Sequence, residues 1–181
     1  MVMISKKICL VGDFGVGKTS LIRRFVDDQF SDEYLSTVGV KISRKKVDVA
    51  FKNTEENTSV QLLIWDLEGH TKFKAIAPQY LLGAHGAIIV ADVTRPETID
   101  GISERLELFL SVNPQGVAVI MALNKSDLVD VEIVNKLFDK FNNGQDERVI
   151  GTYSTSAKTG KNVDDIFYKL AYKLIEKNVS S

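Results

Sequence analysis

Apolar runs of strand length alternate with amphipathic helical stripes along the whole chain. Such alternation is typical of a largely parallel β-sheet with helices on both faces. Strands are expected at residues 8–11, 60–65, 87–91, 117–123 and 149–153, and the third and fourth of these runs are almost entirely apolar, as buried parallel strands are. The sequence therefore predicts an α/β fold with a buried sheet.

Residues 40–51 are an exception, because basic side chains at 44–46 interrupt their alternation. A polar turn at 52–59 joins them to the next run, as in a hairpin. We expect an antiparallel edge strand here. The basic run is either a docking surface for a partner or a device against edge-to-edge aggregation of the sheet, and the second interpretation is favoured.

The chain has 181 residues, little more than the length of one domain, so residues 1–181 are expected to form a single domain. Its 23 Lys and Arg balance 24 Asp and Glu, which argues against nucleic-acid binding. No apolar run is long enough to cross a bilayer, and neither end carries a lipidation signal. We expect a cytoplasmic monomer without a membrane anchor of its own, whose membrane association comes through partners.

Residues 12–19 read Gly-Asp-Phe-Gly-Val-Gly-Lys-Thr and fit the pattern GxxxxGK[ST] between an apolar strand and a helical stripe. Glycines let backbone N–H groups and the helix N-terminus face phosphates. Lys18 neutralises the outer phosphates, and the Thr19 hydroxyl takes a Mg²⁺ position. The predicted binding residues of this P-loop are Phe14, Gly15, Val16, Gly17, Lys18, Thr19 and Ser20.

The tetrapeptide Asn-Lys-Ser-Asp at 124–127 follows a predicted buried strand. Ligands of open α/β sheets bind at the carboxyl ends of strands, where this segment lies. The Asp127 carboxylate can accept both N1–H and the 2-amino group of guanine, whereas adenine offers neither donor there. Asn124, Lys125 and Asp127 therefore predict a guanine site.

Two further segments supply candidates around the terminal phosphate. Asp66 ends a predicted strand and can hold a Mg²⁺-bound water, and the N–H of Gly69 can approach the phosphate. The Thr37 hydroxyl lies in a polar stretch and becomes a second Mg²⁺ ligand only when the terminal phosphate is present. Such a loop orders and releases with the nucleotide state. The predicted metal ligands are Thr19, Thr37 and Asp66.

With these motifs the sequence resembles the Ras-like small GTPases, most closely the Rab family, over nearly the whole chain. The resemblance also includes Phe30 and Tyr34, the run 83–94 and the Thr-Ser-Ala-Lys segment at 155–158. It implies a small G-domain of the P-loop NTPase class, with a six-stranded mixed sheet and five helices. His85 falls in a stretch that is structural in Rab proteins, so we expect it to pack without a catalytic role.

The resemblance also implies which residues contact the base and which contact the phosphates. Phe30 and Lys125 would flank the base, Tyr34 would cover the phosphates, and the Ala157 N–H would contact the carbonyl oxygen of the base. The second base loop implied in this way comprises Ser156, Ala157 and Lys158.

Three positions around the expected terminal phosphate depart from the family pattern. Phe14 stands where relatives carry a small residue, Glu68 where Rab proteins have alanine, and His70 where they have glutamine. We expect Phe14 to obstruct an activating arginine, and Glu68 to repel the γ-phosphate or compete for the metal unless it points elsewhere. The catalytic candidates are His70, Gly69 and Lys18.

The sequence thus predicts a molecular switch that binds GTP and GDP with Mg²⁺ and hydrolyses GTP slowly. It would signal to effector, exchange-factor and activator proteins through the loops of Thr37 and Gly69. A pseudo-GTPase scaffold is the alternative, favoured by the three departures and opposed by the complete metal set. A phosphate-loop kinase would need a basic lid over the transferred phosphoryl group, and none is evident.

Overall fold

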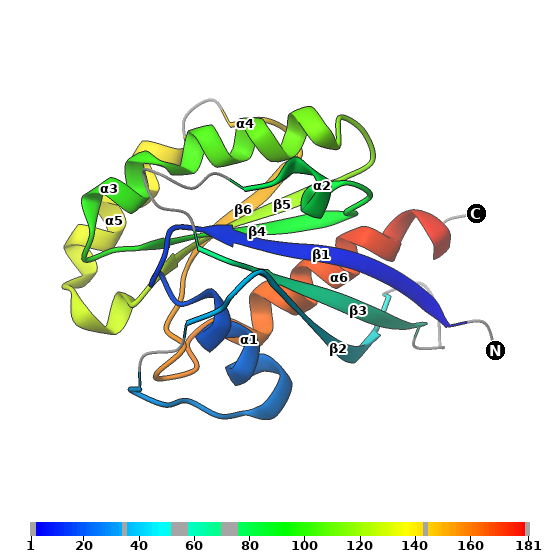
Figure 1. Cartoon of the computed structure of the whole chain (residues 1–181), viewed down its shortest axis with the longest axis horizontal. Coiled ribbons are helices and arrows are strands. Elements are labelled where there is room, and N and C mark those ends of the chain that lie inside the picture. Colours follow the sequence, from blue (N-terminus) through cyan, green and yellow to red (C-terminus); the bar gives the residue numbers. More distant parts are fainter. Residues whose placement is uncertain (1–2, 34–35, 52–57, 70–75, 143–144, 180–181) are drawn as a thin grey trace.

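A computed structural model of the chain describes residues 3–33, 36–51, 58–69, 76–142 and 145–179 (Figure 1). They contain a six-stranded sheet in the order β2-β3-β1-β4-β5-β6. Only the β2–β3 pair is antiparallel within it, so the predicted mixed sheet with one antiparallel edge strand is confirmed. The strands are β1 (Ile4–Gly12), β2 (Val40–Val49), β3 (Thr58–Leu67), β4 (Gly86–Asp92), β5 (Ala118–Asn124) and β6 (Val149–Ser154).

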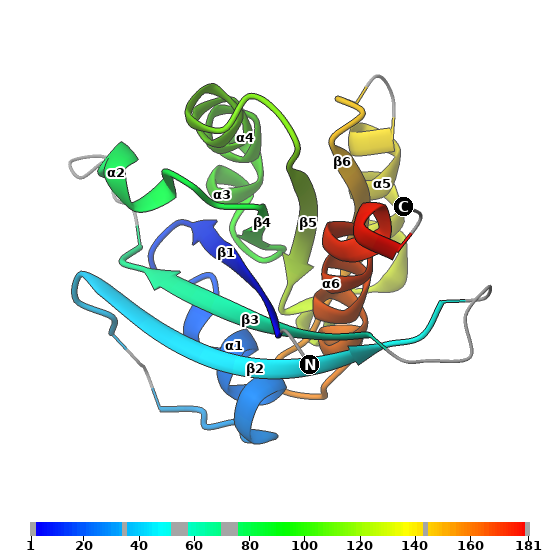
Figure 2. The ribbon, with the colours of Figure 1, turned by 90° about the vertical axis from the view of Figure 1, so that its right-hand side faces the viewer.

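Helices lie on both faces of the sheet (Figure 2). Two of them, α3 and α4, are separated only by Gly101, whose own backbone is right-handed helical at φ −74° and ψ −10°. Taken as one interrupted helix, they bring the described part of the chain to the five helices expected. The helices are α1 (Lys18–Asp27), α2 (Pro78–Leu81), α3 (Pro96–Asp100), α4 (Ile102–Val112), α5 (Val131–Asn142) and α6 (Val163–Val179), and a 3₁₀ turn, η1, spans Ser126–Leu128.

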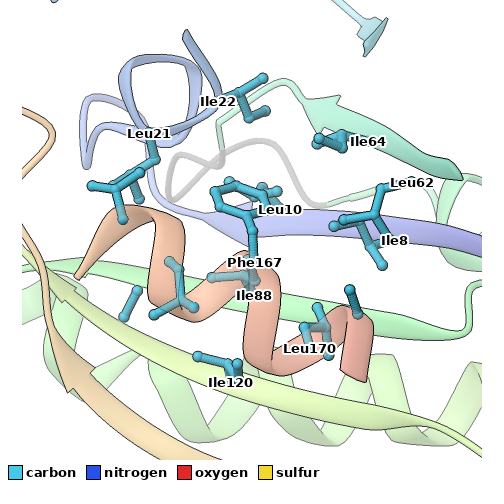
Figure 3. Close-up of a cluster of buried hydrophobic side chains, with 14 of the residues drawn as sticks. Ile8, Leu10, Leu21, Ile22, Leu62, Ile64, Ile88, Ile120, Phe167 and Leu170 are labelled. Carbon is cyan, nitrogen blue, oxygen red and sulfur yellow. The ribbon is translucent and has the colours of Figure 1, made fainter. Parts of the chain in front are cut away.

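Alternating side chains of the central strands feed two hydrophobic clusters, one on each face. In the first, Phe167 and Leu170 of α6 pack against β1, β4 and β5 (Figure 3). Phe167 is fully buried, and its ring stacks on that of Phe25 at 4.1 Å between centroids. The second cluster lies beneath α2, α3, α4 and α5. Every residue of β4 and β5 is buried, as their apolar sequences predict.

The predicted bounds of all six strands need correction, by one or two residues except at the start of β1. β1 begins at Ile4 rather than at residue 8, because its polar first half pairs with β3 from Val60 onward. Lys7 is tolerated there since its ammonium group lies over the ring of Trp65, 3.7 Å from the centroid. The edge strand ends at Val49, before residue 51.

The basic run of the edge strand does not form one surface. Lys45 turns towards α1, where its Nζ donates to the carbonyl of Val26 at 3.3 Å. Arg44 and Lys46 lie on the opposite side of the strand and are exposed. The expected role against edge-to-edge aggregation stays a prediction. Within the described ranges, no helix combines the length and the apolar character needed to cross a membrane.

His85 packs against the start of the sheet and has a structural hydrogen bond. Its Nδ1 accepts the N–H of Lys7 at 3.1 Å, which requires an unprotonated Nδ1. Burial, together with the charges of Lys6 and Lys7, lowers the pKa of His85 below 6.5.

We predict a pH-dependent stability from this histidine. Because its pKa is lower in the folded state, the stability it contributes is complete above pH 6.5 and is lost as the pH falls through the folded pKa. Chemical denaturation between pH 7.5 and 5 should show that the free energy of unfolding falls less steeply in His85→Gln than in the parent chain. The chain has two histidines, so His70→Gln is measured in parallel to show how much of the parent slope comes from the other histidine. Equal slopes in the parent and His85→Gln would contradict the prediction.

Candidate functional site

The carboxyl ends of β1, β3 and β5 meet at one edge of the sheet, and the loops that follow them enclose a pocket of about 290 Å³. Ligands of open α/β sheets bind at this edge. The phosphate loop follows β1 and passes into α1, so the predicted strand–loop–helix context is present.

Two glycines give the phosphate loop its shape. Gly15 and Gly17 have φ values of 75° and 102°, in the left-handed region that favours glycine. A Cβ at Gly17 would also lie 2.3 Å from Nδ2 of Asn124, which instead donates to the carbonyl of Val16 at 2.9 Å. The predicted guanine residue Asn124 therefore also holds the phosphate loop in place.

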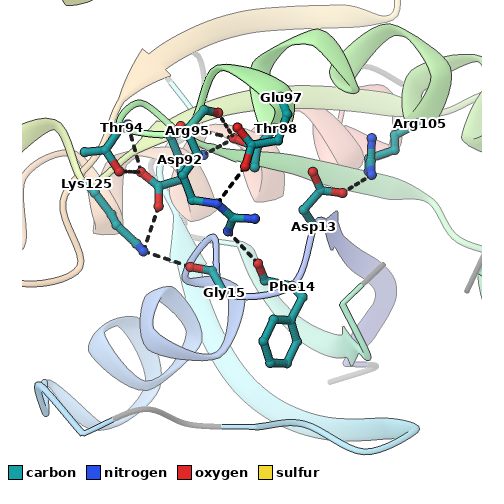
Figure 4. A network of polar contacts seen from close by, with 10 residues as sticks. All are labelled: Asp13, Phe14, Gly15, Asp92, Thr94, Arg95, Glu97, Thr98, Arg105 and Lys125. Carbon is teal, nitrogen blue, oxygen red and sulfur yellow. Dashed lines mark hydrogen bonds and ion pairs between the residues drawn. The ribbon is translucent and has the colours of Figure 1, made fainter. Parts of the chain in front are cut away.

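Side chains from outside the loop hold its carbonyl groups (Figure 4). Arg95 Nη1 donates to the carbonyl of Phe14 at 2.7 Å, and Lys125 Nζ donates to that of Gly15 at 2.8 Å. Lys125 also pairs with Asp92, 2.8 Å from Nζ to Oδ2. When successive carbonyls are held in this way, the N–H groups of a loop can converge on its inner side and bind an anion.

Lys18 supplies a buried positive charge at the pocket wall. Its Nζ donates to the carbonyls of Gly12 and Asp13, both at 2.9 Å. Burial lowers the pKa of Lys18 to about 8, against the opposing influence of the carboxylates of Asp66 and Asp13. An anion in the pocket would favour the protonated form of this lysine.

Three oxygen-bearing side chains converge beside Lys18. Thr19 Oγ1 donates to Asp66 Oδ2 at 2.6 Å and lies 2.7 Å from Thr37 Oγ1, which is itself 3.3 Å from the same carboxylate oxygen. Burial raises the pKa of Asp66, although the hydroxyl hydrogen bonds oppose this. The other oxygen, Oδ1, is buried without a hydrogen-bond partner among the described residues.

This donor set fits a small hard cation. Mg²⁺ uses oxygen ligands, keeps several waters and is usually bound by one or two carboxylates together with substrate phosphates. The unpartnered Asp66 Oδ1 can accept from a metal-bound water, and the two hydroxyls are oxygen ligands. The described residues hold no cluster of three or more His, Cys, Asp or Glu, so an all-protein metal cage is not formed among them.

The predicted base segments lie against each other. Ser156 Oγ donates to Asp127 Oδ1 at 2.7 Å, and Thr155 Oγ1 donates to Asn124 Oδ1 at 3.1 Å. These bonds orient the carboxylate of Asp127 and the amide of Asn124. The segment at 155–158, implied only by the family resemblance, thus joins the tetrapeptide at 124–127.

Most of the predicted binding residues line the pocket. Val16 and Ser156 do not line it, but the Val16 carbonyl accepts from Asn124 and the Ser156 hydroxyl donates to Asp127. Tyr34 and His70 lie outside the described residues. Asp66 lies behind Thr19 and Thr37 rather than at the wall. The predicted residues that line the pocket are Phe14, Gly15, Gly17, Lys18, Thr19, Ser20, Phe30, Thr37, Gly69, Asn124, Lys125, Asp127, Ala157 and Lys158.

Of the departures from the family pattern, Phe14 lines the pocket and Glu68 does not. Phe14 is 42% exposed at the pocket, and its backbone packs so closely on Gly69 that a Cβ at Gly69 would lie 2.4 Å from Phe14 Cα. Glu68 pairs with Gly39: its N–H donates to the Gly39 carbonyl at 2.8 Å, and its Oε2 accepts the Gly39 N–H at 3.2 Å. The carboxylate therefore ties the Thr37 loop to the end of β3, because a backbone donor lies within its reach.

Sequence reasoning missed several residues that hold or line the site. Arg24 donates to the carbonyl of Ala157. Arg95 donates to the carbonyl of Phe14, and Arg105 pairs with Asp13 (Figure 4). No short motif contains them, and the one available signal is that Arg95 directly follows the family-like segment 92–94. The lining residues that were not predicted are Ser31, Asp32, Glu33, Leu67 and Leu128.

Comparisons with known proteins agree with this arrangement. The family model described as "Ras family" matches residues 7–176. The chain is 34% identical over 174 residues to GTP-binding protein ypt5 of Schizosaccharomyces pombe, covering 96% of this chain and 80% of that protein. It is 37% identical over 172 residues to Ras-related protein Rab-1 of Theileria annulata, covering 94% and 74% respectively. With human Ras-related protein Rab-22A the identity is 33% over 174 residues, covering 96% and 86%.

Proposed function

The chain belongs to the Ras family, and on that premise we propose that it is a GTP-hydrolysing switch whose residues 1–181 form one guanine-nucleotide-binding domain. One observation carries the proposal. A single pocket has the glycine-rich loop with the buried Lys18 at one end and Asp127 with Ala157 at the other. A cationic end and a carboxylate end suit the phosphates and the base of one nucleotide.

At the phosphate end, the loop from Phe14 to Ser20 would bind through its N–H groups and Lys18. At the base end, Asp127 would accept N1–H and the 2-amino group, while the Ala157 N–H would donate to the 6-oxo group. Phe30 and Lys125 would flank the ring, and Tyr34 would cover the phosphates. The Ser156–Asp127 hydrogen bond supports this assignment, since it presents the carboxylate in a fixed orientation.

Thr19, Thr37 and Asp66 would hold a Mg²⁺ ion, the last through a water on its free Oδ1. A bound Mg²⁺ supplies positive charge that neutralises the β- and γ-phosphates. Thr37 could then respond to the terminal phosphate, because its hydroxyl already lies 2.7 Å from that of Thr19. The loops of Thr37 and Gly69 are thus the natural surfaces for effector, exchange-factor and activator proteins.

Hydrolysis would proceed by attack of water on the γ-phosphorus, with GDP leaving and inorganic phosphate released. Lys18 and the Gly69 N–H would stabilise charge on the transferred group, and His70 would orient the water. The rate is expected to be low, because Phe14 crowds the phosphate position beside Gly69.

A second candidate function is a scaffold that binds nucleotide without useful turnover. The pairing of Glu68 with Gly39 favours it, since this contact holds the Thr37 loop without any help from a γ-phosphate. The complete set of metal-binding oxygens opposes it.

We expect a monomer that reaches membranes through partners and otherwise stays in the cytoplasm.

The first test is nucleotide identity and selectivity. Chromatography of nucleotide released from the purified protein should show GDP or GTP. Titration of nucleotide-free protein with Mg²⁺ should show that ATP binds more weakly than GTP by roughly four orders of magnitude, because Asp127 loses both donors. EDTA should accelerate GDP release.

Single-turnover phosphate release separates the two candidate functions. Slow but measurable release from bound GTP supports the switch, whereas tight GTP binding with no release over hours supports the scaffold. Comparable affinities for ATP and GTP would contradict both.

A further inference from the structure

Arg24 of α1 is an arginine that reaches the base loop without lining the pocket. Its Nε donates to the carbonyl of Ala157 at 2.8 Å, and its Nη2 donates to that of Lys158 at 2.5 Å. A third contact, from Nη1 to Asp28 at 3.5 Å, is weaker, because Asp28 is 95% exposed while Arg24 is only 21% exposed. The main partners of this guanidinium are therefore two consecutive backbone carbonyls.

Two separate sets of hydrogen bonds hold the base loop, residues 156–158. Ser156 is held within its own loop, since its N–H donates to Lys161 at 3.1 Å and its carbonyl accepts from Gly160 at 2.8 Å. The Ser156 carbonyl shares its peptide plane with the Ala157 N–H, so the bond from Gly160 sets the direction of that N–H. The next two carbonyls, of Ala157 and Lys158, are held from outside the loop by Arg24 of α1. The N–H of Ala157 has no acceptor among the residues that the structure describes, although Ala157 lines the pocket.

Arg24 lies in the middle of a continuous helix, α1. This helix begins at Lys18 in the phosphate loop and continues without a break past Arg24. The base loop is thus tied, through residues 18–24 of this helix, to the loop proposed to bind phosphates. A planar guanidinium can donate to two carbonyls at once in fixed directions, which an ammonium group on a flexible stem cannot do.

We propose that Arg24 is a positioning residue for recognition of the 6-oxo group of guanine: it holds the carbonyls of Ala157 and Lys158 towards α1 and so fixes the place of Ala157, whose N–H is aimed at the base by the bond between Gly160 and Ser156. This inference rests on the proposed function. The carboxylate of Asp127 is oriented separately, by Ser156. Arg24 therefore acts on one edge of the base and Asp127 on another.

The two edges can be tested with three diphosphates. GDP carries both the 6-oxo and the 2-amino group, and inosine diphosphate lacks the 2-amino group. 2-Aminopurine riboside diphosphate lacks the 6-oxo group and with it the N1–H, so each variant is compared with the parent chain on the same nucleotide. Dissociation constants are measured in the presence of Mg²⁺ for the parent chain, Arg24→Ala and Arg24→Lys. Arg23→Ala is the matched control, because it removes a neighbouring arginine of α1 whose side chain makes no hydrogen bond or ion pair among the described residues.

Arg24→Ala should weaken GDP and inosine diphosphate by about tenfold each and leave 2-aminopurine riboside diphosphate unchanged. Arg24→Lys should behave in the same way, which preserves the test if the alanine variant folds poorly, and Arg23→Ala should match the parent. An equal loss for all three nucleotides would show a general structural role and overturn the inference, as would unchanged GDP affinity in both Arg24 variants. Failure of the parent chain to bind GDP would instead overturn the proposed function.

Discussion

Replacing Asp127 by asparagine is expected to convert the site from guanine to xanthine nucleotides. The carboxylate accepts two donors of guanine, whereas an amide can accept one and repels the 2-amino group. Losing one of these hydrogen bonds, and the charge assistance of the other, should weaken GDP binding by about a hundredfold to ten-thousandfold. Xanthosine diphosphate should bind better to Asp127→Asn than to the parent, since its 2-carbonyl accepts from the new amide.

Asparagine can replace Asp127 while keeping the hydrogen bond that orients this side chain. Ser156 Oγ donates to Asp127 Oδ1, and an asparagine can keep this bond through its own Oδ1. Asp130→Asn is a suitable control, because it makes the same chemical change three residues further along the chain, outside the pocket. Competition binding of GDP and xanthosine diphosphate measures the exchange of preference. If Asp127→Asn retained the preference of the parent for GDP, the assignment of this carboxylate to the base would be wrong.

Local motifs predicted much of the fold and of the pocket. The segments at 12–19 and 124–127 each follow an apolar run, and parallel strands bring their carboxyl ends to one edge. Short-range spacing therefore sufficed to place Lys18, Asn124 and Asp127 at one pocket. The segment at 155–158 came only from family resemblance, because its contacts with 124–127 depend on the pairing of β5 with β6.

The residues that were missed depend on long-range packing. Arg24 contacts a loop 133 residues away, and Arg95 contacts one 81 residues away. A charged side chain usually faces solvent, and apart from the place of Arg95 after the segment 92–94 no local pattern distinguishes these two from their neighbours. The expectation for Glu68 illustrates the same limit. Its carboxylate was placed from its position beside Asp66, whereas the Gly39 N–H that it accepts comes from the paired strand region.

The second large effect that we expect is on the rate of GTP hydrolysis, and it depends on Phe14. Its carbonyl is already occupied by Arg95, and its backbone lies against Gly69. The side chain is 42% exposed at the pocket, where an activating arginine would have to reach the γ-phosphate. Phe14→Gly should therefore restore access for an arginine-supplying activator while leaving GDP affinity nearly unchanged.

His70 lies outside the described residues, so its part in the prediction rests on the sequence. A histidine is shorter than glutamine and its ring nitrogens lie in different directions, so it orients a water differently. The translational GTPases, however, use a histidine at the matching place, so activity need not be lost. His70→Gln should raise the intrinsic single-turnover rate on the order of tenfold, which corresponds to about 1.4 kcal/mol in the barrier.

The two positions are expected to act together in the transition state. Phe14→Gly with His70→Gln should accelerate activator-stimulated hydrolysis by more than the product of the two single effects, because glutamine orders the water that the arginine then stabilises. Single-turnover phosphate release, with and without an arginine-supplying activator, measures all four proteins. A parent chain that already hydrolyses GTP as fast as the double variant would show that neither residue obstructs the reaction. If the effect of the double variant equals the product of the two single effects, Phe14 and His70 affect different steps. Phe14 would then limit the access of the arginine, and His70 the positioning of the water.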